Sequence, residues 1–148
     1  MQPIRSQLVG AWFVFFLSAA SAAAMDRWLA LAKFESNNND LAVGRAGEVS
    51  RFQITPALWK ANAAAGSSPR DARTAGRVAR SIMDERCVAF ERHRHRRPSD
   101  FEFYVLWNAP AYLLQGKPVS HTVAGRARRF CRLVATRTPA KQVSSSEP

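Results

Sequence analysis

The most distinctive chemical group in this sequence is the acid Glu35, which follows a mostly apolar run and precedes a serine and three asparagines. Three apolar residues before it share one helical face: Trp28, Leu31 and Ala32. Glu35 continues that face at the i+7 position, so the spacing predicts a carboxyl group that points inward. Burial against apolar neighbours raises the pKa of a carboxyl group, so such an acid can still hold a proton near neutral pH.

Two roles are open to this acid. A protonated carboxyl group can donate its proton to the departing oxygen of a glycosidic bond. A half-exposed glutamate at a helix end can instead form an ion pair with one of the many arginines of the chain. Periodicity alone favours the ion pair.

Two further acids follow within a short distance, Asp40 and Glu48. Ordinary glycosidases flank the bond that they cleave with two carboxyl groups, so either acid is a candidate second carboxylate. Asp40 can also be a turn residue at the end of a helix, because Asp and Asn tolerate turn conformations. Glu48 can also pair with Arg45 or Arg51 within the loop.

The first residues have the order of a secretory signal peptide. One positive charge, Arg5, precedes an apolar segment over residues 8–17 and then the small residues of 22–24. The apolar segment is shorter than the roughly twenty residues that a membrane span needs. We therefore expect cleavage after residue 24, with an uncleaved anchor as the alternative, and an exported protein that is periplasmic or secreted.

The chain after residue 24 is strongly basic, with 21 Lys+Arg against 11 Asp+Glu once Arg5 is removed, a formal charge of +10. The arginines cluster in ERHRHRRP (91–98) and in the last predicted helix. Clustered arginine is typical of phosphate contact, so a nucleic-acid or anionic-surface binder is a rival hypothesis. Since an export signal argues against nucleic acid, we expect the charge to hold the protein on an anionic cell envelope.

The elements that must position these side chains are mainly helices in one domain over residues 25–135. Two segments have the pattern of a helix start: the Ser68-Pro69 pair and the Ser99-Asp100-Phe101-Glu102 run. A last helix carries an apolar stripe over 123–134, with its arginines mainly outside that stripe. Residues 43–55 are expected to be irregular or a short β-hairpin, and the polar tail 136–148 is expected to be disordered.

The two cysteines, Cys87 and Cys131, both fall on apolar helical faces. In an exported chain this number of cysteines favours one disulfide, and two buried free thiols are the alternative. The spacing of His and Cys does not predict a metal site.

Several short motifs together resemble one known signature. Glu35-Ser36, Ala42-Val43, Gly47 and Phe52-Gln53-Ile54 followed by Pro56 resemble the pattern of the soluble lytic transglycosylase and goose-type lysozyme-like families. VLWNAP (105–110) resembles a second block of those families, and RARRFCRLV (126–134) sits where they carry a final helix. The resemblance covers residues 28–134. It departs at Ser50, where a glycine is usual, and at Trp107, where a tyrosine is usual.

The resemblance implies a lysozyme-like fold, no cofactor, and cleavage of peptidoglycan glycan strands by a monomer. Glu35 would act as acid and then as base, which gives a 1,6-anhydro product. Substrate contacts would come from Ser36, Gln53 and Asn108. Tyr104 and Trp107 are further candidates, because their rings could stack on sugar faces. Ser36 is alternatively a residue that orients Glu35, and the two aromatic residues are alternatively part of the core. A hydrolytic lysozyme with a second carboxylate and a non-catalytic glycan-binding relative remain alternatives.

Overall fold

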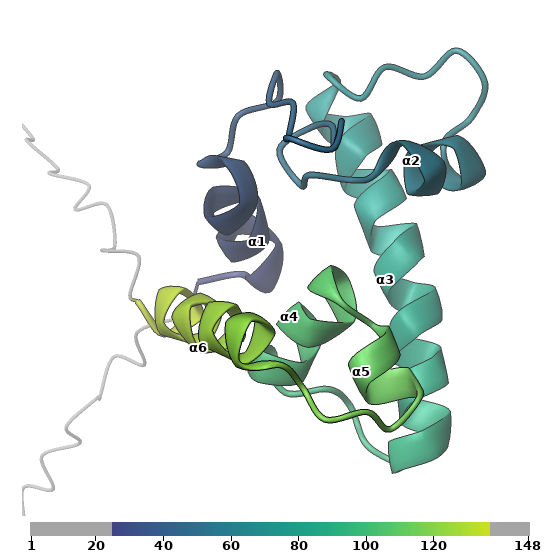
Figure 1. Ribbon diagram of the computed structural model, residues 1–148. Coiled ribbons are helices and arrows are strands. Elements are labelled where there is room, and N and C mark those ends of the chain that lie inside the picture. The colour runs from purple at the N-terminus through teal and green to yellow at the C-terminus, as the bar shows by residue number, and fades with distance from the viewer. Residues whose placement is uncertain (1–24, 137–148) are drawn as a thin grey trace, which may run out of the picture.

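The computed structural model describes residues 25–136, which fold into six helices (Figure 1). Their bounds are α1 Arg27–Ser36, α2 Pro56–Asn62, α3 Ala72–Arg94, α4 Asp100–Asn108, α5 Ala111–Leu114 and α6 His121–Ala135. Residues 25–136 contain no β-sheet, so the expected mainly α class is confirmed. The predicted signal peptide (1–24) and the tail beyond Thr136 lie outside the described residues.

Helix α4 lies at the centre of the molecule and is apolar on all sides (Figure 1). Its residues 103–107 are all buried, as expected for a helix that other helices surround. α4 packs against α3, α5 and α6. Its start is the predicted one, because Ser99 and Glu102 form a capping box in which each side chain bonds the backbone N–H of the other residue.

An aromatic cluster joins α1, α4 and α6. The ring of Phe34 on α1 packs edge-on against Tyr104 of α4 and Phe130 of α6, with centroids 5.1 and 6.2 Å apart. Edge-to-face pairs at these separations are favourable beyond their buried area. The cluster therefore holds the C-terminal end of α1, where Glu35 lies, against α4 and α6.

The long helix α3 begins later than predicted. Ser68 and Pro69 form a turn in which the Ser68 hydroxyl accepts only from the backbone of Arg70. The N-cap is Asp71, whose carboxylate accepts a 2.7 Å bond from the backbone N–H of Thr74. The capping pattern at Ser68 was therefore wrong by three residues, because the competing Asp71 cap has the stronger, charged acceptor.

Residues 43–55 are irregular rather than a hairpin of two strands. Val49 forms isolated antiparallel bridges to both Val43 and Ile54. Ser50 and Gln53 have positive φ angles of 68° and 52°, which L side chains rarely adopt. The segment folds back on itself through these two residues and ends at α2, a helix that the sequence analysis did not predict.

The two cysteines are free thiols in this structure, and both are half-buried. The expected disulfide is therefore not formed in it. Burial raises the pKa of each thiol, and the positive charge of Arg27 partly opposes this effect. Within residues 25–136, no helix combines the length and the apolar character that crossing a membrane requires.

Candidate functional site

A cleft of about 420 Å³ opens between the C-terminal ends of α1 and α4, the 44–55 segment and α6. It brings together five residues that the sequence singled out: Glu35, Glu48, Gln53, Trp107 and Asn108. These residues come from three separate parts of the chain. The cleft also contains three arginines that the sequence analysis did not place there: Arg45, Arg86 and Arg126.

Glu35 lies in the wall of this cleft with its side chain only 8% exposed. The Tyr104 hydroxyl donates a 2.9 Å hydrogen bond to Oε1 of Glu35. Nη2 of Arg126 lies 3.2 Å from Oε2 and 3.4 Å from Oε1, and Nε of Arg126 donates to the Tyr104 oxygen at 2.7 Å. The carboxyl group is thus held by one residue of α4 and one of α6.

Burial decides the acidity of Glu35. It raises the pKa of the carboxyl group above its ordinary value of 4.5, and this effect outweighs the opposing effects of Tyr104 and Arg126. The nearby charge of Glu48 also raises the pKa of Glu35. Both roles considered for Glu35 are thus partly present. The side chain is ion-paired, as the ion-pair alternative predicted, and it is buried with a raised pKa, as a proton donor requires.

Tyr104 has no surface on which a sugar could stack. The residue is 0% exposed, and Phe34 and Phe130 pack against its ring. The prediction of a stacking contact at Tyr104 was therefore wrong. Tyr104 acts on the site through its hydroxyl group, which bonds Glu35.

The opposite wall of the cleft depends on Gly44. A Cβ atom at this position would lie 2.3 Å from Oε2 of Glu48 and 2.5 Å from Oε1 of Gln53, so both side chains fold over the glycine. Oε2 of Glu48 accepts from the backbone N–H of Ala46 at 2.9 Å, and the Gln53 amide donates to the Ser50 carbonyl at 3.1 Å. The φ of Gln53 is 52°, a conformation that L side chains rarely adopt, so the surrounding loop holds this residue in place.

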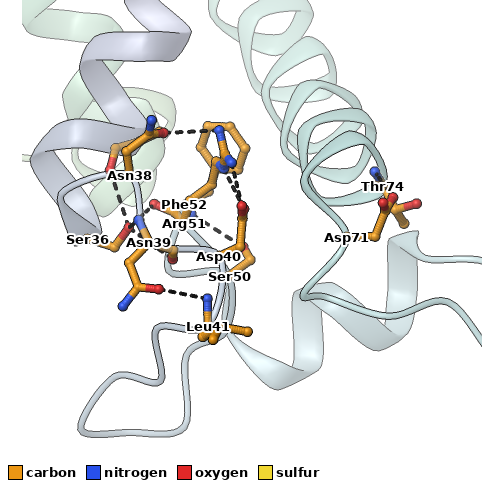
Figure 2. A network of polar contacts seen from close by, with 11 residues as sticks. Ser36, Asn38, Asn39, Asp40, Leu41, Ser50, Arg51, Phe52, Asp71 and Thr74 are labelled. Carbon is orange, nitrogen blue, oxygen red and sulfur yellow. Dashed lines mark hydrogen bonds and ion pairs between the residues drawn. The ribbon is translucent and has the colours of Figure 1, made fainter.

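Ser36 and Asp40 brace the loop instead of contacting the cleft. The Ser36 hydroxyl donates to the Arg51 carbonyl at 2.9 Å and accepts from the backbone N–H of Asn39 at 3.0 Å. Asp40 forms a two-pronged ion pair with Arg51, which also donates to Asn38 (Figure 2). Neither side chain lines the cleft, so the structure does not bring the predicted substrate contact Ser36 or the candidate second carboxylate Asp40 to it.

The C-terminal end of α4 presents Trp107 and Asn108 to the cleft. Asn108 is exposed, so its amide is free to meet a ligand, whereas Trp107 is 9% exposed. Nη1 of Arg86 donates to the carbonyl groups of Leu106 and Trp107, both at 2.8 Å. Arg86 therefore satisfies carbonyl groups that have no partner within the helix and fixes the helix end.

Arg126 and Arg86 are the residues that sequence reasoning missed. Arg126 lies three residues after Val123 and four before Phe130, so it borders the apolar stripe of α6, and this spacing was the available signal. Arg86 lies on α3 and gave no signal, because only the tertiary fold brings it to the end of α4. The sequence does not separate either residue from the many other arginines of the chain.

The site therefore consists of a buried acid with a raised pKa, a second carboxylate across an open cleft, and two amide side chains. Comparison of the chain with protein-family models, with curated proteins and with solved structures found no match.

Proposed function

We propose that this protein is a peptidoglycan-cleaving lytic transglycosylase that acts on the β-1,4 bond between N-acetylmuramic acid and N-acetylglucosamine. The observation that carries the proposal is Glu35, a nearly buried carboxyl group with a raised pKa in the wall of an open cleft. The substrate class comes from the resemblance of the 35–56 motif to the soluble lytic transglycosylase families. Residues 1–24 would export the protein to the compartment that holds this substrate.

In this mechanism Glu35 performs both proton transfers. The protonated carboxyl group donates its proton to the departing glycosidic oxygen, which breaks the bond to C1 of the muramic acid. The resulting carboxylate then accepts the proton of the 6-hydroxyl group of the same sugar. The oxygen of that hydroxyl group bonds to C1 and closes the 1,6-anhydro ring. Burial favours the protonated form before the first transfer, and the donors Tyr104 and Arg126 stabilise the carboxylate after it.

The amides of Gln53 and Asn108 would bind the sugars. An amide donates and accepts at once, so it can bind hydroxyl and N-acetyl groups of the glycan. Both residues line the same cleft as Glu35.

Glu48 supports one alternative, a hydrolytic lysozyme. Its carboxylate lines the same cleft and is close enough to raise the pKa of Glu35. In a two-carboxylate mechanism Glu48 would activate a water molecule or attack the sugar.

Digestion of purified peptidoglycan followed by mass analysis of the released muropeptides separates the two reactions. The proposal expects 1,6-anhydro ends, each lighter than a reducing end by one water, and substantial activity in Glu48→Gln. Reducing ends together with an inactive Glu48→Gln variant would establish the lysozyme instead. Absence of any cleavage by the folded wild-type protein would reject both enzymes.

A further inference from the structure

A second cavity of about 470 Å³ lies between α1 and the N-terminal half of α3. Its walls include Trp28 and Leu29 of α1, Arg51 and Phe52 of the loop, and five residues of α3: Ala72, Arg73, Gly76, Arg77 and Arg80. It shares no lining residue with the Glu35 cleft. We call this cavity the α1–α3 groove.

The groove is strongly positive. Four arginines line it, Arg51, Arg73, Arg77 and Arg80, against one acid. That acid, Asp26, uses its carboxylate to cap α1 by accepting a 2.7 Å bond from the backbone of Trp28. Arg51 is neutralised by its ion pair with Asp40, which Figure 2 shows beside the start of α3.

The three arginines of α3 have no such partner. Within residues 25–136, none of them forms an ion pair. They stand at i, i+4 and i+7 on one helical face, where like charges destabilise the helix. Arg77 donates to the Thr74 hydroxyl. Hydrogen bonding to Thr74 lowers the pKa of Asp71, and the charges of Arg77 and Arg73 add to this effect without forming an ion pair with the carboxylate. The row therefore keeps an excess of positive charge, which an anionic partner would neutralise.

The arginine row has a defined length, and the floor of the groove beside it is open. At a rise of about 1.5 Å per residue, positions 73 and 80 lie roughly 10 Å apart along the axis of α3. Between them, Gly76 lines the groove, and a Cβ atom there would meet nothing within 4 Å. Arginine binds phosphate through two parallel N–H donors, so the row suits several consecutive phosphate groups.

The remaining walls distinguish between polyanions. The groove offers side-chain donors and no strand edge, so an extended peptide would find no partner for its backbone groups. Trp28 offers no free face for a nucleic-acid base, because the Arg80 guanidinium lies 4.7 Å above its ring and Phe52 and Phe103 pack against it. We propose that the α1–α3 groove binds a linear phosphate polymer that lacks bases. This site goes beyond the proposed glycan cleavage and does not depend on it.

The test measures binding of a fluorescently labelled inorganic polyphosphate chain by anisotropy at fixed ionic strength. Arg73→Gln/Arg77→Gln/Arg80→Gln should weaken binding by about tenfold or more, because it removes charge-assisted bonds. The matched control removes three exposed arginines far from the groove: Arg92 and Arg94 at the C-terminal end of α3, and Arg97 just after it. The control variant should retain the wild-type affinity within about threefold. Equal weakening in both variants would overturn the proposal, since it would indicate unspecific attraction to net charge.

A second pair of variants avoids the loss of three charges. Gly76→Glu should place an acid in the open floor and weaken polyphosphate binding much more than Gly76→Ala, which adds a methyl group that meets nothing within 4 Å. Competition identifies the ligand class, because unlabelled polyphosphate should displace the probe better than polyglutamate or oligothymidine of equal charge. Stronger displacement by polyglutamate or by oligothymidine would reject a phosphate polymer without bases, and unchanged affinity in Gly76→Glu would reject the groove.

Discussion

The hydroxyl group of Tyr104 donates a 2.9 Å hydrogen bond to the carboxyl group of Glu35, across 69 residues of sequence. Tyr104 lies on the buried central helix and is itself fully buried, so it holds the acid from the protein side and leaves the cleft side open.

Glu35→Gln should abolish glycan cleavage while the protein remains folded. The amide keeps the shape of the side chain but cannot deliver a proton, and general acid–base catalysis is worth about 10²–10⁴-fold. Turbidity loss of purified peptidoglycan measures the activity, and circular dichroism checks the fold. Glu85→Gln, an exposed acid on α3, is the matched control and should cleave as wild type does. Equal activity of wild type and Glu35→Gln would exclude the enzyme.

Tyr104→Phe should move the alkaline limb of the pH–activity profile to higher pH. The hydroxyl group lowers the pKa of Glu35 by bonding its carboxylate form, so removing it raises that pKa further. The general acid then keeps its proton to higher pH. Initial rates across a pH series measure the limb, and Tyr112→Phe provides the control. A shift of the limb to lower pH would contradict the described contact.

The stability of the protein should also depend on Glu35. The folded-state pKa is raised above 4.5, so the native state binds more protons than the unfolded state between these two values. Stability from this group is therefore full below pH about 4.5 and is lost as pH rises through the folded-state pKa. Because Glu35→Gln removes this loss, its melting temperature relative to wild type should rise with pH across that window. A constant difference between the two melting curves would show that burial does not perturb Glu35.

Gly44→Ala should impair the cleft without unfolding the protein. A Cβ atom at this position displaces the flexible ends of Glu48 and Gln53, and small misplacements in an active site can cost about 10²-fold in rate. Gly76→Ala is the matched control, because the same change on the open face of α3 should stabilise the helix by about 0.5–1 kcal/mol. Cleavage assays and thermal melts distinguish the two variants. Full activity of Gly44→Ala would show that the positions of these two side chains are unimportant.

Asp40→Asn should leave the chemistry intact and weaken the loop. The ion pair with Arg51 is partly exposed, so its loss should cost about 1 kcal/mol or less. Arg51 lies two residues before Gln53 in the same loop. We therefore expect a small decrease in melting temperature, with most of the activity retained. Inactivation as complete as that of Glu35→Gln would restore Asp40 as a second carboxylate.

The sequence predicted the parts of this structure that depend on local pattern. The i+7 position of Glu35 on an apolar face correctly placed its side chain inward, and the Ser99–Glu102 pair correctly marked the start of α4. Gln53 and Asn108 came from a motif rather than from periodicity, and the fold brings both to the Glu35 cleft.

The sequence could not predict contacts that join distant segments. Arg126 and Glu35 lie 91 residues apart. The spacing of α6 places Arg126 at the border of its apolar stripe, but it does not identify an acid on α1 as the partner. The Asp40–Arg51 pair was missed for a related reason, because a loop with two positive-φ residues has no regular period from which side-chain directions follow. Ser68 failed as a helix start because two capping residues competed within three positions.

The partners of Glu35 have a consequence for the newly made chain. Helix α6 is the last helix of the described chain, and until it docks, Glu35 lacks Arg126 as well as part of the packing that removes water from it. The missing cover removes part of the burial that raises the pKa of Glu35, and the missing guanidinium removes an effect that lowers it. The surroundings of the acid are thus complete only once α6 has docked, so a chain folded only as far as α5 would hold an incomplete site.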